Sequence, residues 1–303
     1  MIKNIIILLL LLLLILLILS SKHKKIRYEK FRYETFSISN RINYPVKLDV
    51  FKVYNDSDYF KKFNSYDIKL RNLSPKLLHN QYINNIINPS SNDKKIVYKI
   101  IIDIDKDLKH KNNKTILNDK WNISLFKNLE HNYPHTHKHI IFIPSNNLTY
   151  NIYNKITFLH EKIHVSQRKY PNVFKELYEK YWFFKHIPKF KIKNKLFTRV
   201  NPDTEDLNWV FTYKKCNIIF LAKYNSNAKN ISDVTYIGYN IDTHKYKKLE
   251  NIPEYIEFFG NNSNHYYHPY EISADMISNH CYNNVDDNTK AYKNFKKWWK
   301  NLN

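Results

Sequence analysis

The feature that most constrains this chain is a helical segment that carries two histidines on one face. In residues 151–169, apolar residues recur at intervals of three and four, which predicts an amphipathic helix. His160, Glu161 and His164 lie inside it as the pattern H-E-x-x-H. Residues four apart project from the same side of a helix, so we expect the two imidazoles to lie one turn apart.

This pattern is typical of a zinc site. Two neutral imidazoles at this separation can bind one Zn²⁺ ion, and Glu161 can reach a water on the metal without binding the metal itself. The metal lowers the pKa of that water from about 15.7 toward about 7. Glu161 would then accept the proton as the water attacks a carbonyl carbon. The alternative is a surface helix with two solvated histidines.

A third ligand is expected on a second helix. The continuation H-x-x-G-x-x-H is excluded, because Gln167 and Tyr170 stand at the glycine and histidine positions. A proline at the first helical position predicts a helix over 269–281. Glu271 could supply the third ligand there, and Asp275 could accept a hydrogen bond from the ring N–H of a ligand histidine. The alternative is a negative first turn that complements the helix dipole.

The residues His160, Glu161 and His164, followed by Glu271 and Asp275 as E-x-x-x-D, resemble the gluzincin group of zinc metallopeptidases. The resemblance implies three zinc ligands, His160, His164 and Glu271. It also implies that Glu161 is the general base and that Asp275 accepts a hydrogen bond from a ligand histidine.

The resemblance covers about residues 138–282 and includes poorly characterised H-E-x-x-H proteins of viruses and bacteria. It implies that the strand around 138–143 pairs with an extended peptide substrate. From His164 to Glu271 the chain runs 107 residues, which is long for a gluzincin, and inserted strands would fill this gap. The family stabilises the oxyanion with Tyr, His or Arg, and the candidates by proximity are His265, Tyr266, Tyr267 and His268.

Composition excludes several other classes of protein. Two glycines cannot form a Rossmann or Walker A loop, and two cysteines cannot form a four-cysteine zinc site. The formal net charge is +22. Because the lysines are dispersed, they indicate a solvated surface and argue against a nucleic-acid partner.

An unbroken run of Ile and Leu occupies residues 5–19, near the minimum length for a membrane span of about 20 residues. We predict an uncleaved single-pass anchor, because Ile18 and Leu19 are too large for a signal-peptide cleavage site. The alternative is secretion after cleavage. The basic residues that follow favour a cytoplasmic body, whereas several Asn-x-Ser/Thr triplets suit a lumenal one.

The predicted organisation has three parts. Residues 1–21 are the hydrophobic anchor or signal, 22–92 a basic stalk and N-terminal region, and 93–303 a zincin-like metallopeptidase domain. We expect an α+β fold with a mixed sheet and an active-site helix. Strands are predicted at 96–104, 139–143, 216–222 and 233–241.

Two further features leave alternatives open. His135, His137 and His139 would share one face of a strand, and with His131 they could bind metal, line the cleft or form a solvated edge. Residues 290–300 interleave aromatic residues with lysines. Such a helix either lies on a membrane or nucleic acid, or packs its aromatic side chains on the body.

We therefore expect a membrane-anchored zinc metallopeptidase that hydrolyses peptide bonds in a peptide or protein, with a virion or an infected host cell as candidate settings. The alternative is a membrane-tethered basic protein that binds a protein or nucleic acid and carries an inactive H-E-x-x-H.

Overall fold

A computed structural model describes residues 19–20, 41–110, 120–188, 190, 192, 197–204, 208–261, 266–282 and 288–302. The chain divides into two units, Met1–Ile42 and Asn43–Asn303. Except for Leu19, the apolar run 5–19 lies outside the described residues. Among the helices that are described, none is long and apolar enough to cross a bilayer.

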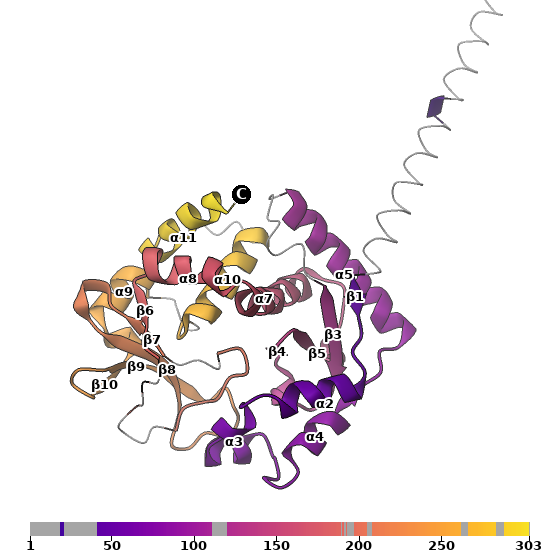
Figure 1. The fold of residues 1–303 in the computed structure, drawn as a ribbon, viewed down its shortest axis with the longest axis horizontal. Helices are drawn as coiled ribbons and strands as arrows, with labels where there is room; N and C mark the ends of the chain where they lie inside the picture. Colours follow the sequence, from indigo (N-terminus) through magenta and orange to yellow (C-terminus); the bar gives the residue numbers. More distant parts are fainter. Residues whose placement is uncertain are drawn as a thin grey trace, which may run out of the picture. The chain divides into compact units, whose positions relative to one another are not determined.

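A mixed five-stranded sheet lies in the first part of the larger unit (Figure 1). Its strand order is β1-β3-β5-β4, and β2 pairs with β3. The strands are β1 (Ile42–Asn43), β2 (Ile86–Ile87), β3 (Trp121–Phe126), β4 (His135–His137) and β5 (Ile140–Pro144). β3 and β5 run parallel, whereas β4 is antiparallel to β5. Both edges of β5 are thus paired, so the expectation that the strand at 138–143 pairs with a peptide is wrong.

The predicted strand at 96–104 is also wrong, because these residues lie in the long helix α5 (Ser91–His110). Its Ile and Val content suggested a strand. The buried positions instead recur at helical spacing, at Val97, Ile100, Ile101, Ile104 and Leu108. Reciprocal hydrogen bonds between Ser90 and Asp93 cap the first turn and fix where the helix begins.

Three short helices precede α5. They are α2 (Lys47–Asn55), α3 (Ser65–Leu70) and α4 (Leu78–Asn84). Two of them, α2 and α4, pack on the mixed sheet. Val50 and Tyr54 of α2 share one hydrophobic cluster with Phe126 of β3 and Phe142 of β5. Helices on one side of the predicted boundary at residue 93 therefore contribute to the same core as strands on the other side.

The two helices that carry the motifs confirm the helices predicted at 151–169 and 269–281. Helix α7 (Ile152–Lys169) begins after Asn151, whose side chain accepts a hydrogen bond from the Asn154 N–H. Helix α10 (Pro269–Tyr282) begins at its proline. The two helices pack against each other, and α7 also contacts β4 and β5 of the mixed sheet.

The residues that separate α7 from α10 in the sequence include an antiparallel five-stranded sheet (Figure 1). Its order is β10-β9-β8-β7-β6, and its strands are β6 (Phe184–His186), β7 (Trp209–Phe211), β8 (Ile218–Tyr224), β9 (Val234–Asn240) and β10 (Tyr246–Lys248). Strands β8 and β9 confirm the predictions at 216–222 and 233–241. The described fold is therefore α+β, with one mixed and one antiparallel sheet.

The remaining helices belong to the part of the chain that contains the antiparallel sheet. They are α8 (Pro171–Glu176), continued by the π turn η4 (Leu177–Tyr181), then α9 (Pro253–Phe259) and α11 (Lys290–Asn301). In α11, Phe295, Trp298 and Trp299 are buried, while Lys296 and Lys297 are exposed. Of the two alternatives for residues 290–300, the structure has the helix that packs its aromatic side chains on the body.

Candidate metal centre

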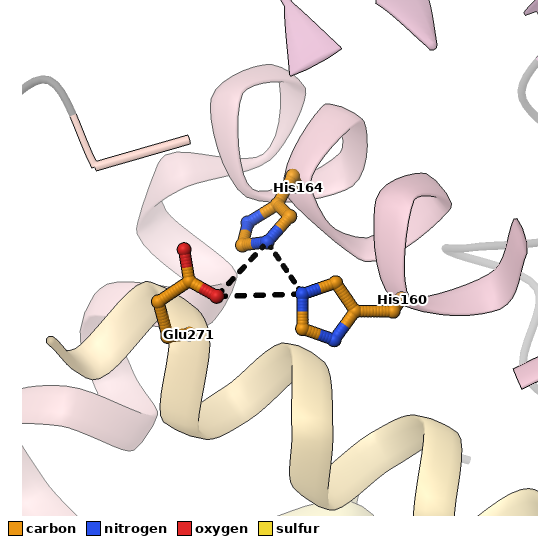
Figure 2. Close-up of side chains that lie close together, drawn as sticks. All are labelled: His160, His164 and Glu271. Atoms are coloured by element: carbon orange, nitrogen blue, oxygen red, sulfur yellow. Dashed lines mark hydrogen bonds and ion pairs between the residues drawn. The ribbon is translucent and has the colours of Figure 1, made fainter. Parts of the chain in front are cut away.

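The structure brings His160, His164 and Glu271 together (Figure 2). The Nε2 atoms of the two histidines lie 3.0 Å apart, and Oε2 of Glu271 lies 3.4 Å and 3.7 Å from them. The histidines project from α7 and the carboxylate from α10. Two of the three side chains remain partly exposed, so the point between them can be reached from solvent.

The tautomer of His164 is fixed by its neighbour Gln167. Nδ1 of His164 lies 2.9 Å from Oε1 of Gln167. The Gln167 amide cannot be reversed, because its Nε2 donates to the Tyr270 carbonyl at 2.8 Å, and a carbonyl only accepts. His164 therefore carries its proton on Nδ1 and presents a lone pair at Nε2.

The tautomer of His160 is fixed in the same way by a carboxylate. Oδ1 of Asp275 lies 2.9 Å from Nδ1 of His160 and accepts its proton. Burial opposes a charge on His160, but the Asp275 carboxylate outweighs burial and raises the pKa of this imidazole well above its usual value. A proton and a metal ion thus compete for Nε2 of His160.

Nε2 of both imidazoles and one carboxylate oxygen consequently converge on a single point. A metal ion at this point, or a proton on Nε2 of His160, relieves the repulsion between their lone pairs. Ligands of a tetrahedral zinc ion lie at about 2.0–2.1 Å from the metal and hence about 3.3 Å from one another. The observed separations of 3.0–3.7 Å fit that geometry, so His160, His164 and Glu271 form a candidate metal site.

The third motif residue, Glu161, is buried beside this point. Only 4% of it is exposed, and its Oε2 has no hydrogen-bond partner among the residues that the structure describes. Burial and the neighbouring Asp203 carboxylate raise the pKa of Glu161 well above its usual value. A carboxylate with a raised pKa and a free oxygen is suited to accept and return a proton.

Asp203 completes a second set of ligand atoms, with Glu161 and His164. His164 belongs to both sets. Asp203 is held by the backbone N–H of Thr136 at 2.8 Å and by Arg168 at 3.6 Å.

The sequence Asn201-Pro-Asp is typical of a turn or a helix cap, and the structure adds contacts with the site. The turn is present, since the Asp203 N–H donates to Oδ1 of Asn201 at 3.0 Å. In addition, Nδ2 of Asn201 donates to Oε1 of Glu271 at 2.7 Å and to the Tyr267 hydroxyl at 2.5 Å. Arg199 donates to the same hydroxyl at 3.0 Å. A local sequence pattern could not reveal these contacts, because they join residues 66–70 positions apart.

The site opens into a cleft of about 720 Å³. His160, Glu161, Glu271 and Asp275 line it together with the segment 199–203. Of the predicted oxyanion candidates, Tyr267 lines the cleft, His265 lies outside the described residues, and His268 is buried and accepts the Tyr270 N–H at the start of α10.

The histidines of 131–139 do not form one cluster. His135 is buried and lines the cleft, and His137 is buried behind it against Tyr54 and Tyr59. His131 and His139 are exposed. Within the described part of the chain, the two sets of candidate ligands include none of these four histidines.

A buried ion-pair network supports the far end of the cleft. Arg71 pairs with Glu130 at 2.8 Å and with Asp67 at 2.7 Å. The Tyr59 hydroxyl donates to Glu130 at 2.7 Å, and Tyr82 donates to the same oxygen. This network joins the short helices to the loop before β4.

No family model, curated protein or solved structure matches this chain. The gluzincin resemblance therefore stays limited to the short motifs in α7 and α10. The chemistry of the site rests on the side chains described above.

Proposed function

We propose that this protein is a zinc-dependent metallopeptidase, anchored in a membrane by residues 5–19. The observation that supports the proposal most strongly is the convergence of two imidazole lone pairs and the Glu271 carboxylate on one point. His160, His164 and Glu271 would hold the ion in a zincin-like domain, and Asp275 and Gln167 would orient the two imidazoles.

Zinc bound there would supply a Lewis acid that activates water and polarises a carbonyl group. The free Oε2 of Glu161 would accept the proton of the attacking water and pass it to the leaving amine. The raised pKa of Glu161 supports this role, because a more basic carboxylate takes up the proton of the attacking water more readily.

The Tyr267 hydroxyl is the candidate donor to the oxyanion. Its oxygen already accepts hydrogen bonds from Arg199 and Asn201. A hydroxyl has two lone pairs, so these two donors leave its proton for an acceptor in the cleft. A donor aimed at the developing charge typically contributes about 10²–10³-fold to the rate.

The experiment that tests the proposal is the Glu161→Gln substitution in the full chain. We expect this variant to keep its zinc. It should hydrolyse a fluorogenic peptide library at least about 10²-fold more slowly than the wild type. Glu179→Gln, an exposed carboxylate on η4, serves as the matched control. Equal activity of Glu161→Gln would refute the assigned base, and zinc without hydrolysis in the wild type would favour the tethered binding protein.

A further inference from the structure

The edge of the mixed sheet that borders the cleft is already occupied. β4 is the edge strand, and the backbone N–H of Thr136 points away from β5 to Oδ1 of Asp203 at 2.8 Å. Arg168 donates to the Thr136 carbonyl at 3.4 Å and to the Lys138 carbonyl at 3.3 Å. The preceding position on this edge, Pro134, has no N–H to offer.

The opposite wall of the cleft is equally closed to strand addition. Along residues 198–200, the Arg199 N–H donates to the Ala222 carbonyl at 2.7 Å, and the Val200 N–H donates to Asp67 at 3.2 Å. The Val200 carbonyl accepts from Arg71 at 2.7 Å. Because both backbone edges are satisfied, a substrate that enters the cleft must be held by side chains.

One cation stands out among the described side chains that line the cleft. Arg71 is paired with Glu130 and Asp67, whereas Arg199 has no carboxylate oxygen within 4.0 Å among the described residues. Its guanidinium lies over the Tyr267 ring at 5.4 Å and donates one hydrogen bond to that hydroxyl. Nε of Arg199 is buried and has no hydrogen-bond partner within the described part of the chain.

An arginine has five N–H donors in a planar fork that matches a carboxylate. Through Tyr267 and Asn201, a chain of hydrogen bonds links Arg199 to Glu271, so a group paired with Arg199 would lie beside the metal site. The ring of Tyr236 stacks on Tyr267 at 5.2 Å and stiffens this wall. The cation is therefore held in place before any ligand arrives.

We propose that the cleft selects its substrates by a carboxylate that pairs with Arg199. This inference rests on the proposed hydrolase function and adds the substrate class. The carboxylate is either the C-terminus of a short peptide or an Asp or Glu side chain near the scissile bond.

The test compares randomised N-acetyl tetrapeptides as free acids and as C-terminal amides, using the full chain. We expect the wild type to prefer free acids about 10-fold or more, since charge-assisted bidentate pairs are among the stronger hydrogen bonds. A second library of amides with Asp or Asn at one position reports a side-chain carboxylate instead. In Arg199→Gln the acid-to-amide ratio should fall toward one, in Arg199→Lys it should lie between, and in the exposed control Lys185→Gln it should be unchanged.

Binding of the same libraries to Glu161→Gln, measured by saturation-transfer NMR, supplies a readout that needs no hydrolysis. A preference for carboxylates in binding that Arg199→Gln abolishes would support the inference, even if the wild type hydrolysed nothing. The inference would be overturned if the wild type bound and hydrolysed acids and amides equally well. It would also be overturned if the acid-to-amide ratio were the same in Arg199→Gln as in the wild type. Hydrolysis without a carboxylate preference would overturn it while leaving the proposed function intact.

Discussion

Oδ1 of Asp275, on α10, lies 2.9 Å from Nδ1 of His160, on α7, and this contact fixes which imidazole nitrogen faces the candidate metal site. Gln167 does the same for His164 at an identical distance. A carboxylate and an amide thus impose the tautomers that metal binding would require, so the two candidate ligands are already oriented.

We predict that Asp275→Asn weakens zinc binding by about 10–100-fold, because a neutral amide orients the ring less firmly and makes it less basic. The measurement is a competition titration against a zinc-sensitive chelating dye. Asp242→Asn, in an exposed loop, is the control and should bind zinc as the wild type does. An unchanged zinc affinity in Asp275→Asn would show that the contact has no part in the site.

The Arg71–Glu130 pair should make the fold sensitive to acid. Burial alone would raise the pKa of Glu130, but Arg71, with His135 and two tyrosine hydroxyls, lowers it from 4.5 to about 2. The resulting stabilisation is present above pH 4.5 and is lost as the pH falls through about 2. One pKa unit corresponds to about 1.4 kcal/mol, so Glu130 contributes about 3 kcal/mol at pH 7 and about 1 kcal/mol at pH 3.

Urea unfolding of Glu130→Gln at both pH values checks this estimate. We expect the deficit relative to the wild type to shrink by about 2 kcal/mol between pH 7 and pH 3. Glu176→Gln removes an exposed carboxylate paired with Lys180 and should change stability by less than about 0.5 kcal/mol. A deficit in Glu130→Gln that does not depend on pH would contradict the assigned pKa.

The aromatic face of α11 should behave as core. Trp298 is 1% exposed and its ring lies 5.8 Å from that of Phe174. We predict that Trp298→Ala lowers the free energy of unfolding by about 3–5 kcal/mol, whereas Lys297→Ala changes it by less than about 0.5 kcal/mol. If Trp298→Ala left stability unchanged and instead reduced binding to anionic vesicles, α11 would be a membrane-surface helix.

Local sequence patterns were sufficient where the spacing within one helix carries the information. The i, i+4 pairs of His160 with His164 and of Glu271 with Asp275 each define a helix face. A helical period identified α7, and a proline at the first helical position identified α10. That α7 and α10 pack together depended on the resemblance, since nothing local links residues 107 positions apart.

Other features could not be predicted. In one case the composition favoured a different secondary structure, and in the others the interacting residues lie far apart in the sequence. Helix α5 is rich in Ile, so β-branched content outweighed its helical period. Arg199 and Asn201 have no motif that identifies their role, and they join the site through hydrogen bonds to Tyr267 and Glu271. Long-range hydrogen bonds of this kind leave no trace in a single sequence.

The most direct test of the metal centre is the zinc content of the full chain, purified without chelators and measured by mass spectrometry. We predict about one zinc per chain in the wild type, and less than about a tenth of that in a variant that combines His160→Ala with Glu271→Gln. Circular dichroism would verify that the variant is folded. The absence of stoichiometric zinc from wild-type protein supplied with the metal, or an unchanged zinc content in the double variant, would contradict the account.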